Sequence, residues 1–201
     1  MKRFLTCLLA LTLVLGCVFA LASCGEEETP KTESKAESKN EEASSQDTVS
    51  ESKDYVLAEG YKLYTKKDIS FAYPEDWELT DGANPIMIDE MGNNFNLTYE
   101  NANKENTQLY KTLSNDNFME YFGNVFEAMG MNIKSYDVKR VTNAGGVEII
   151  RCEYSISYQN INMNMYQFII PGEKTHYNVT ATEMTSISDE VKELFDSIRV
   201  K

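Results

Sequence analysis

Histidine and basic charge are both scarce in this chain of 201 residues. His176 is the single histidine, so a metal site built from several histidines is excluded, and a histidine-based catalytic triad would depend on this one residue. Acidic residues outnumber basic ones 32 to 19, and the net charge of −13 argues against binding to nucleic acid or anionic headgroups. Gly145 and Gly146 are an isolated pair rather than a phosphate loop. Nucleic acids and nucleotides are therefore not expected as partners.

Cysteine is concentrated at the N-terminal end. Cys7, Cys17 and Cys24 lie at the start of the chain, and only Cys152 lies in its body. No intramolecular disulfide is expected once the N-terminal segment has been processed. Cys152 alternates with large apolar residues in a strand-like pattern, so we expect a buried core side chain rather than a nucleophile.

The long apolar run of the chain, Phe4–Leu21, follows Lys2 and Arg3. A positive end before such a run is typical of an export signal. The run ends in Leu21-Ala22-Ser23-Cys24, which resembles the lipobox of bacterial lipoproteins. The resemblance implies that residues 1–23 are a lipoprotein signal peptide and that Cys24 carries the lipid anchor, with palmitate-type acyl chains.

Two alternatives stay open at this end of the chain. Ala20-Leu21-Ala22 fits the site of ordinary signal peptidase, and the apolar run is nearly long enough to remain a transmembrane helix. Both leave the cysteine at position 24 unexplained, which favours the lipobox. All three interpretations place the following domain outside the cytoplasm, and the lipobox places it at the cell membrane, on its extracytoplasmic side.

The segment at residues 24–54 has the composition of a linker. Glu26–Asp54 consists almost entirely of Glu, Lys, Ser, Thr, Ala, Asn and Gln, with Val49 as its large aliphatic residue. Such a segment buries too little apolar surface to offset the entropy of ordering, so we predict a disordered acidic linker. The four-residue spacing of the lysines from Lys31 to Lys39 leaves a helix with weak ion pairs as the alternative.

Aromatic and β-branched residues begin at Tyr55, so the folded domain is predicted at residues 55–201. Period-two alternation and short turns rich in Gly, Asn and Pro indicate a domain made largely of strands. The predicted strands are Tyr61–Tyr64, Ile69–Tyr73, Pro85–Ile88, Asn94–Glu100, Ile133–Thr142, Val147–Tyr158, Ile161–Ile170 and Thr175–Thr182. The connections between the last four are too short for parallel crossovers, so these strands form an antiparallel meander.

Two helices with apolar stripes are also predicted. The first is Asn115–Met129 with Ser114 as its N-cap, and the second is Asp189–Ile198 with Ser188 as its N-cap. The strand Ile161–Ile170 has large apolar residues on both faces, so both faces of the sheet must be covered. We therefore predict an α+β fold in which an antiparallel β-sheet is flanked by helices, an α/β/α sandwich.

The order of elements resembles the PsbP-like and Mog-like superfamily, which includes many small bacterial lipoproteins. The resemblance depends on Phe71-Ala72-Tyr73-Pro74-Glu75-Asp76-Trp77 near the start and on Phe195-Asp196-Ser197-Ile198 in the closing helix, and it spans Tyr61–Lys201. Pro74 is expected to end a strand, and Trp77 to supply a large apolar anchor. The resemblance implies a PsbP-like fold and a non-enzymatic role, although a shared fold does not transfer a particular function.

Two polar positions in the domain are candidates for chemistry. His176 alternates with Asn178 on the more polar face of a strand, so we expect a surface or rim histidine, the alternative being a catalytic base that would need a nucleophile. Asp89 and Glu90 precede a Gly-Asn-Asn turn and could supply oxygen ligands to calcium. Their spacing does not match an EF-hand, so a solvated turn is favoured and no metal site is predicted.

Four methionines offer a different kind of site. Met129, Met131, Met163 and Met165 could line an adaptable apolar groove for a lipid or a partner peptide, although filling of the core is the favoured use.

These observations lead to one functional hypothesis and one alternative. The hypothesis is a membrane-anchored extracytoplasmic lipoprotein whose non-enzymatic domain binds an envelope protein or complex. The alternative is a carrier of a lipid or other apolar small ligand. No residue set meets the geometric roles of catalysis, and no cofactor is expected. Apart from Cys24, the sequence assigns no site residue.

Overall fold

The computed structural model describes residues 55–201 of the chain. The predicted signal peptide, the lipid anchor on Cys24 and the linker lie outside the described residues. Within that part, no helix is long and apolar enough to cross a membrane.

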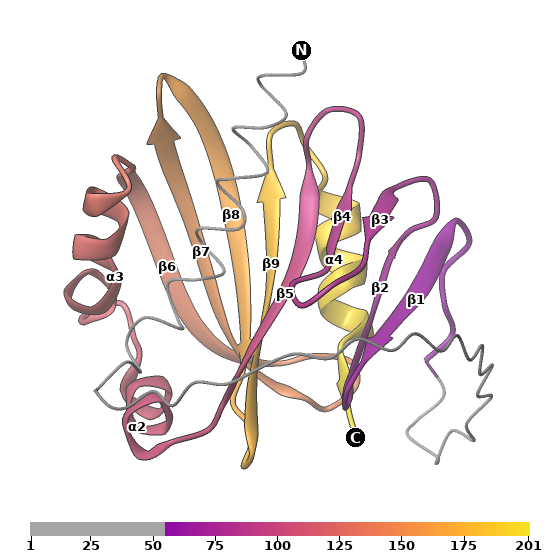
Figure 1. Cartoon of the computed structure of the whole chain (residues 1–201), viewed down its shortest axis with the longest axis horizontal. Coiled ribbons are helices and arrows are strands. Elements are labelled where there is room, and N and C mark those ends of the chain that lie inside the picture. Colours follow the sequence, from indigo (N-terminus) through magenta and orange to yellow (C-terminus); the bar gives the residue numbers. More distant parts are fainter. Residues whose placement is uncertain (1–54) are drawn as a thin grey trace, which may run out of the picture.

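A seven-stranded antiparallel sheet forms the centre of the domain, in the order β3-β4-β5-β9-β8-β7-β6 (Figure 1). Its strands are β3 Glu78–Thr80, β4 Ile86–Ile88, β5 Asn94–Asn101, β6 Asn132–Thr142, β7 Glu148–Tyr158, β8 Ile161–Ile170 and β9 Thr175–Glu183. The predicted meander is confirmed as β6 to β9. The short strand β3 was not predicted, because all three of its side chains are exposed and show no alternation.

A smaller antiparallel sheet joins the two ends of the described region. It contains β1 Tyr61–Lys66, β2 Ile69–Pro74 and β10 Arg199–Val200, in the order β1-β2-β10. Pro74 is the last residue of β2, as predicted. Proline has no N–H to donate, and one further hydrogen bond, from the Glu75 N–H to Gly60 O at 2.8 Å, follows it before the chain leaves β1.

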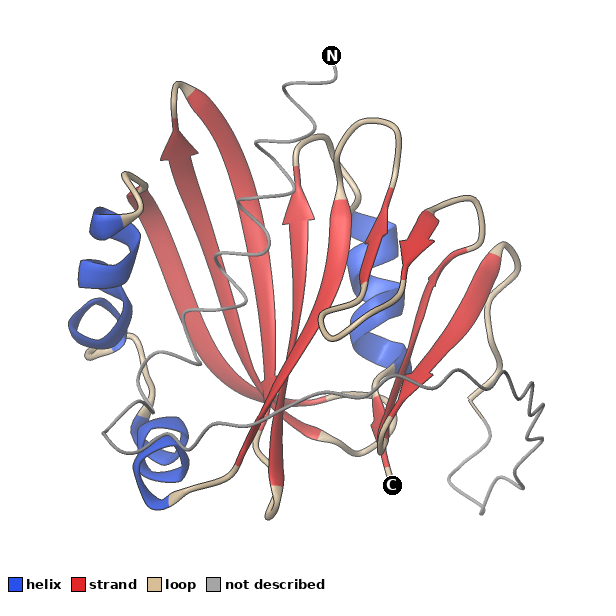
Figure 2. Ribbon diagram, in the orientation of Figure 1, coloured by secondary structure: helices blue, strands red, loops and turns tan. Residues whose placement is uncertain are grey.

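Three helices lie on the two faces of the central sheet within residues 55–201 (Figure 2): α2 Lys104–Thr112, α3 Phe118–Ala128 and α4 Ser188–Ser197. Helix α4 packs against β2 and one face of the central sheet, in a first core that includes Leu194 and Phe168. Helices α2 and α3 pack on the other face, in a second core that includes Phe126 and Tyr154. The predicted α+β class, an antiparallel sheet flanked by helices, is confirmed.

The alternation of side chains along the strands separates the two cores. On β7, Ile149 belongs to the first core, whereas Ile150 and Cys152 belong to the second. Cys152 is fully buried, and burial raises the pKa of its thiol to about 12, so the prediction of a core cysteine is confirmed. Trp77 is also buried, with its ring 4.6 Å from that of Phe95, and is the predicted apolar anchor.

Helix α3 starts three residues later than predicted. Its N-cap is Asn117, and Ser114 lies in the preceding turn, where its backbone N–H donates to Asn117 Oδ1 at 2.9 Å. The prediction of Ser114 as N-cap is wrong, because Ser, Asn and Asp at 114–117 are all favourable N-caps and residue type alone does not choose among them. At the other end, the N–H of Met131 donates to Phe126 O at 2.9 Å, which is a Schellman ending.

Helix α4 begins with Ser188, and its N-cap is Ile187. The prediction of Ser188 as N-cap is therefore wrong by one residue. Ile187 has no polar side chain and makes no side-chain cap, and the buried carboxylate of Glu183 accepts the N–H of Ile187 itself through Oε1 at 3.0 Å. This hydrogen bond joins the last residue of β9 to the start of α4.

The turn between β6 and β7 fixes the other end of α4. Asn143 is only 6% exposed, and its Nδ2 donates to Phe195 O at 2.9 Å and Ile198 O at 2.8 Å. Its Oδ1 accepts the N–H groups of Gly145 and Val147, both at 3.0 Å. One side chain therefore satisfies the last carbonyls of a helix and two amides of the turn.

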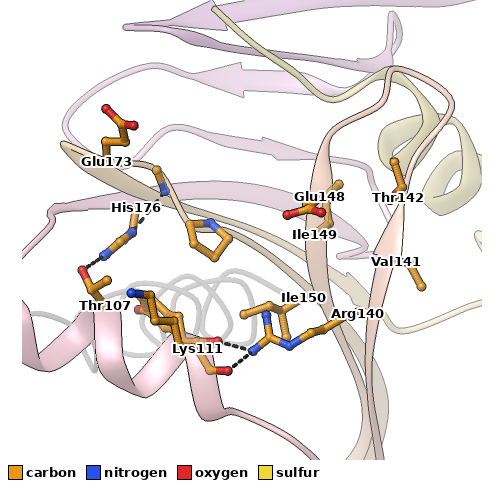
Figure 3. A pocket seen from close by; sticks show the side chains of 13 residues that line it. Thr107, Lys111, Arg140, Val141, Thr142, Glu148, Ile149, Ile150, Glu173 and His176 are labelled. Carbon is orange, nitrogen blue, oxygen red and sulfur yellow. Dashed lines mark hydrogen bonds between the residues drawn. The ribbon is translucent and has the colours of Figure 1, made fainter.

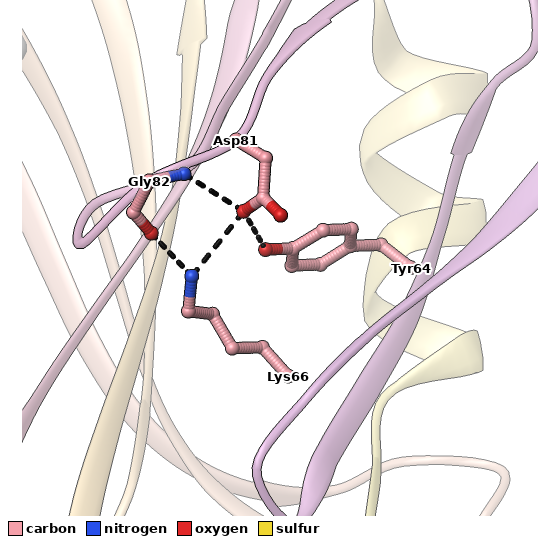
Figure 4. A network of polar contacts seen from close by, with 4 residues as sticks. All are labelled: Tyr64, Lys66, Asp81 and Gly82. Carbon is pink, nitrogen blue, oxygen red and sulfur yellow. Dashed lines mark hydrogen bonds and ion pairs between the residues drawn. The ribbon is translucent and has the colours of Figure 1, made fainter. Parts of the chain in front are cut away.

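A polar network ties the small sheet to the connection between β3 and β4 (Figure 4). The Tyr64 hydroxyl donates to Asp81 Oδ1 at 2.7 Å, and Lys66 Nζ lies 3.2 Å from the same oxygen and also donates to Gly82 O. The hydrogen bond from Tyr64 is the main reason that the pKa of Asp81 is lowered. Burial, assisted by Asp81, raises the pKa of Tyr64 above its ordinary value. The network is structural and distant in sequence from the predicted site residues.

Candidate functional site

Helix α2, which the sequence did not predict, forms one wall of the candidate site. Its start is a capping box: Asn103 Oδ1 accepts the N–H groups of Glu105 and Asn106, and Asn106 Oδ1 accepts the Asn103 N–H at 2.8 Å. Only Tyr110 is fully buried in this helix, so its sequence has no apolar stripe from which a helix could be predicted. The spacing of Asn103 and Asn106 was the one available signal.

His176 lies at the base of this wall and is only 2% exposed. The prediction of a surface or rim histidine is therefore wrong. The residue does lie on the polar face of β9, as its alternation indicated, but α2 covers that face. The Tyr110 ring packs edge-on against the imidazole, with 5.0 Å between the ring centroids.

The hydrogen bonds of His176 indicate which of its two ring nitrogens carries the proton. Nδ1 accepts the N–H of Gly172 at 3.2 Å, so the proton of the neutral ring is on Nε2. Nε2 lies 3.0 Å from Asn106 Oδ1, an acceptor that the capping box orients, and 3.1 Å from Thr107 Oγ1. Burial lowers the pKa of His176, opposed by the carboxylate of Glu100. With its proton on Nε2, the ring is not oriented to take a proton from Thr107, so the pair differs from a nucleophile and its general base.

The opposite end of α2 is held by Arg140 of β6. The Arg140 guanidinium donates through Nη2 to Lys111 O at 2.9 Å and to Tyr110 O. A cation at the C-terminal carbonyls of a helix is favourable for the helix dipole. The Tyr110 hydroxyl donates to Glu100 Oε1 at 2.6 Å, and burial raises its pKa. Helix α2 is thereby fixed to β5 and β6.

A pocket of about 580 Å³ opens between α2, the ends of β6 and β7, and the β8–β9 turn (Figure 3). Ile149 and Ile150 contribute buried apolar surface to its lining. Its charged groups are separated: Lys111 and Arg140 lie on the α2 side, and Glu148 and Glu173 lie away from α2. Within residues 55–201 none of these four charges takes part in an ion pair. The pocket therefore presents an apolar lining between unpaired charges of opposite sign.

The loop at Asp89 and Glu90, for which a solvated turn was favoured over a calcium site, is held by its own hydrogen bonds. Asp89 Oδ1 accepts the N–H groups of Met91 and Asn93 at 2.8 and 2.9 Å, and Asp89 Oδ2 accepts Asn93 Nδ2 at 2.7 Å. In the described part of the chain, no group of three or more His, Cys, Asp or Glu side chains is placed to hold a metal ion. Asn93 also accepts the N–H groups of Met184 and Thr185, so this loop joins β5 to the segment before α4.

The four methionines do not form an open groove. Met131, Met163 and Met165 are buried in the second core, and Met129 is partly buried against it. Their packing agrees with the favoured use, which was filling of the core.

The pocket residues come from four separate stretches of sequence, and only His176 among them was a candidate from its sequence pattern. Lys111, Arg140, Glu148 and Glu173 were missed. Charged residues are common on every protein surface, and no local sequence pattern distinguishes the ones that the fold brings together in a pocket.

The comparisons with known proteins add little to this geometry. No protein-family model and no curated protein matches the chain. A structure from Bacteroides thetaiotaomicron aligns with a TM-score of 0.40 and 12% identity, over 67% of this chain and 45% of its own. A Pseudomonas aeruginosa protein of unknown function aligns with a TM-score of 0.32 and 14% identity, over 64% of this chain and 85% of its own.

A third structure, LpqN of Mycobacterium tuberculosis, is described as involved in cell envelope biogenesis. It aligns with a TM-score of 0.38 and 10% identity, over 66% of this chain and 83% of its own. These likenesses assign neither a family nor a function to this chain. The PsbP-like resemblance and the lipobox stay predictions.

Proposed function

We propose that this chain is an extracytoplasmic lipoprotein, anchored through Cys24, whose domain binds an envelope protein without catalysis. The binding site is the pocket between α2 and the β8–β9 turn. The anchor is supported by the sequence Leu21-Ala22-Ser23-Cys24 after an apolar run. Two acyl chains give a stable attachment, because each buried methylene contributes about 0.8 kcal/mol.

The unpaired charges of the pocket carry the proposal. Lys111 and Arg140 on one side and Glu148 and Glu173 on the other have no ionic partner in the domain, although acidic and basic groups elsewhere on β6 and β7 are paired. Charges of both signs beside an apolar lining are complementary to a polypeptide segment that carries the opposite pattern. The apolar interior of the pocket would accept a side chain of that segment.

A charge reversal tests the pocket. The tagged lipoprotein is cross-linked in intact cells and purified, as wild type, as Lys111→Glu and as Lys104→Glu. Both lysines are exposed on α2, but only Lys111 lines the pocket, so Lys104→Glu is a control for the same reversal of charge on the same helix. We expect a partner that is lost in Lys111→Glu and kept in Lys104→Glu. Equal recovery of every cross-linked protein with all three forms would contradict binding through the pocket.

The anchor is tested separately. Cys24→Ser should abolish incorporation of radiolabelled palmitate and release the domain from the membrane fraction. Unchanged processing and attachment in Cys24→Ser would refute the lipoprotein assignment.

Native mass spectrometry of the purified wild type addresses the alternative of an apolar-ligand carrier. A carrier would retain a bound lipid, and the pocket variant Lys111→Glu would lose it.

A further inference from the structure

A second hollow lies on the opposite face of the central sheet. It lies over strands β6, β7 and β8, and the loop between β9 and α4 forms one of its sides. Two adjoining hollows of about 510 and 300 Å³ share Ser155 and Asn164. We call this surface the polar groove. Ser155 and Asn164 on its floor alternate with Ile156 and Met165, which point into the second core.

The polar groups of this groove are held in place by a network. The Ser155 hydroxyl donates to Asn164 Oδ1 at 2.7 Å, and Asn164 Nδ2 donates to Glu183 Oε2 at 2.8 Å. The Tyr166 hydroxyl donates to the same carboxylate oxygen at 3.2 Å. Glu183 also holds the start of α4 through the Ile187 N–H, so the network is tied to the fold. Groups fixed in this way lose little freedom when a ligand binds.

Each charged side chain around the polar groove has an ion-pair or hydrogen-bond partner within the domain, although Lys134 and Glu183 take part in no ion pair. Glu153 pairs with Arg151 at 2.8 Å, Asp137 pairs with Lys139, and the Glu183 carboxylate accepts three hydrogen bonds. Lys134 Nζ donates to Asn162 Oδ1 at 2.7 Å. Among the described residues, Lys134 is the one exposed side chain lining the groove whose charge is in no ion pair, and its Nζ is already held by Asn162, while Glu183 is buried. The chemistry of the groove therefore fits a neutral ligand.

Hydroxyl and amide groups dominate the accessible surface of the groove. Asn162, Asn164, Ser186 and Ser188 are all exposed, and each amide or hydroxyl group can both donate and accept hydrogen bonds. The floor strands β7 and β8 are paired on both sides, so an extended peptide has no free backbone to pair with on them. A polyhydroxylated ligand makes the best use of such groups.

We propose that the polar groove binds a neutral oligosaccharide. Asn162 and Ser155 hydrogen-bond its hydroxyl groups, and Asn164 is a positioning residue that orients Ser155. This activity is separate from the binding of a protein in the pocket, because the two surfaces lie on opposite faces of the sheet.

Isothermal titration calorimetry of the full lipoprotein in detergent tests the proposal. The probes are maltotetraose, the tetramer of N-acetylglucosamine, and an uncharged Ser-Ala-Ser-Ala peptide with blocked ends. The variants are Asn162→Ala, Ser155→Ala and, as the control, Lys111→Glu. We expect at least one tetrasaccharide to bind and each groove variant to weaken it about five- to tenfold, the loss of one hydrogen bond. Lys111→Glu should bind the sugar as the wild type does.

The outcomes separate this inference from the proposed function. No binding of either tetrasaccharide, or equal binding by all variants, would overturn the oligosaccharide site and leave the protein-binding pocket unaffected. Binding of the peptide with loss in Asn162→Ala would assign the groove to a polypeptide and also overturn the inference. Loss of the sugar only in Lys111→Glu would move the ligand to the pocket and contradict the placement in the groove.

Discussion

The buried histidine makes the stability of this domain dependent on pH. His176 accepts the Gly172 N–H through Nδ1 and donates from Nε2 to Asn106 Oδ1. A second proton on Nδ1 would place a donor against the Gly172 N–H and a charge in a buried site. Burial therefore lowers the pKa of His176 in the folded state, with the nearby Glu100 carboxylate opposing this shift.

The direction and size of the effect follow from proton linkage. Below a pH of about 6.5 the unfolded chain binds a proton at His176 that the folded domain resists, so the free energy of unfolding falls as pH falls. The loss begins near the unfolded pKa and ends at the lowered folded pKa. One proton gives a slope of at most about 1.4 kcal/mol per pH unit, so the loss at pH 5.5 is at most about 1.4 kcal/mol.

Urea denaturation at pH 7.5 and 5.5 measures this loss. Because the chain has one histidine, a variant without it isolates the contribution. His176→Gln keeps a donor near Nε2 but has no proton to gain, and we expect its stability to be less dependent on pH over this interval. If the wild type were equally stable at both values, or if His176→Gln lost as much as the wild type, the assignment of a buried neutral histidine would be refuted.

Three further predictions concern the fold. Asn143→Ala removes two hydrogen bonds at the end of α4 and two in the β6–β7 turn. With partial rescue by water it should lower the free energy of unfolding by about 2–4 kcal/mol in urea, whereas exposed Asn162→Ala should stay within about 0.5 kcal/mol. The thiol of Cys152 in the mature protein should react with a maleimide only after unfolding, because it is buried and its pKa is raised to about 12; rapid reaction in the native state would contradict this. Tyr64→Phe should raise the pKa of Asp81 toward its ordinary value in an NMR titration, since the lost hydrogen bond is the main cause of the shift; an unchanged pKa would assign the shift to Lys66 and Gly82 instead.

The strands could be predicted because the signals that define them, alternating apolar residues and turn residues, lie within each strand and its flanking turns. β8 was predicted at its observed bounds, and the other strands of the meander begin and end within about one residue of the prediction. Each has alternating apolar residues bounded by Gly, Asn or Pro turns. The two-residue strand β10 and the exposed strand β3 offer no such alternation, since they exist through pairing with β2 and β4.

Helix α2 and the site could not be predicted from local sequence patterns. Helix α2 has only one fully buried residue, and its position depends on Arg140 and on the pairing of Tyr110 with Glu100. His176 was placed on the correct face of β9 but assigned the wrong exposure, because a polar face is exposed only if no element covers it. The sequence therefore predicted the sheet on which the pocket is built, and the helix that closes the pocket is defined by tertiary contacts.

The two candidate surfaces differ in a way that the sheet itself imposes. On β7, Ile150 faces the pocket and Ser155 faces the polar groove, because successive side chains of a strand point to opposite faces. Within the described residues, none of the four pocket charges is in an ion pair, whereas Asp137 and Glu153 of the groove are, and Lys134 there donates to the amide of Asn162. If both proposals hold, a polypeptide partner and a neutral sugar would occupy opposite faces of the sheet and would not compete. Because Lys111 and Asn162 share no contact, their substitutions should act independently, and the double variant Lys111→Glu/Asn162→Ala should lose both activities by the factors measured for each alone.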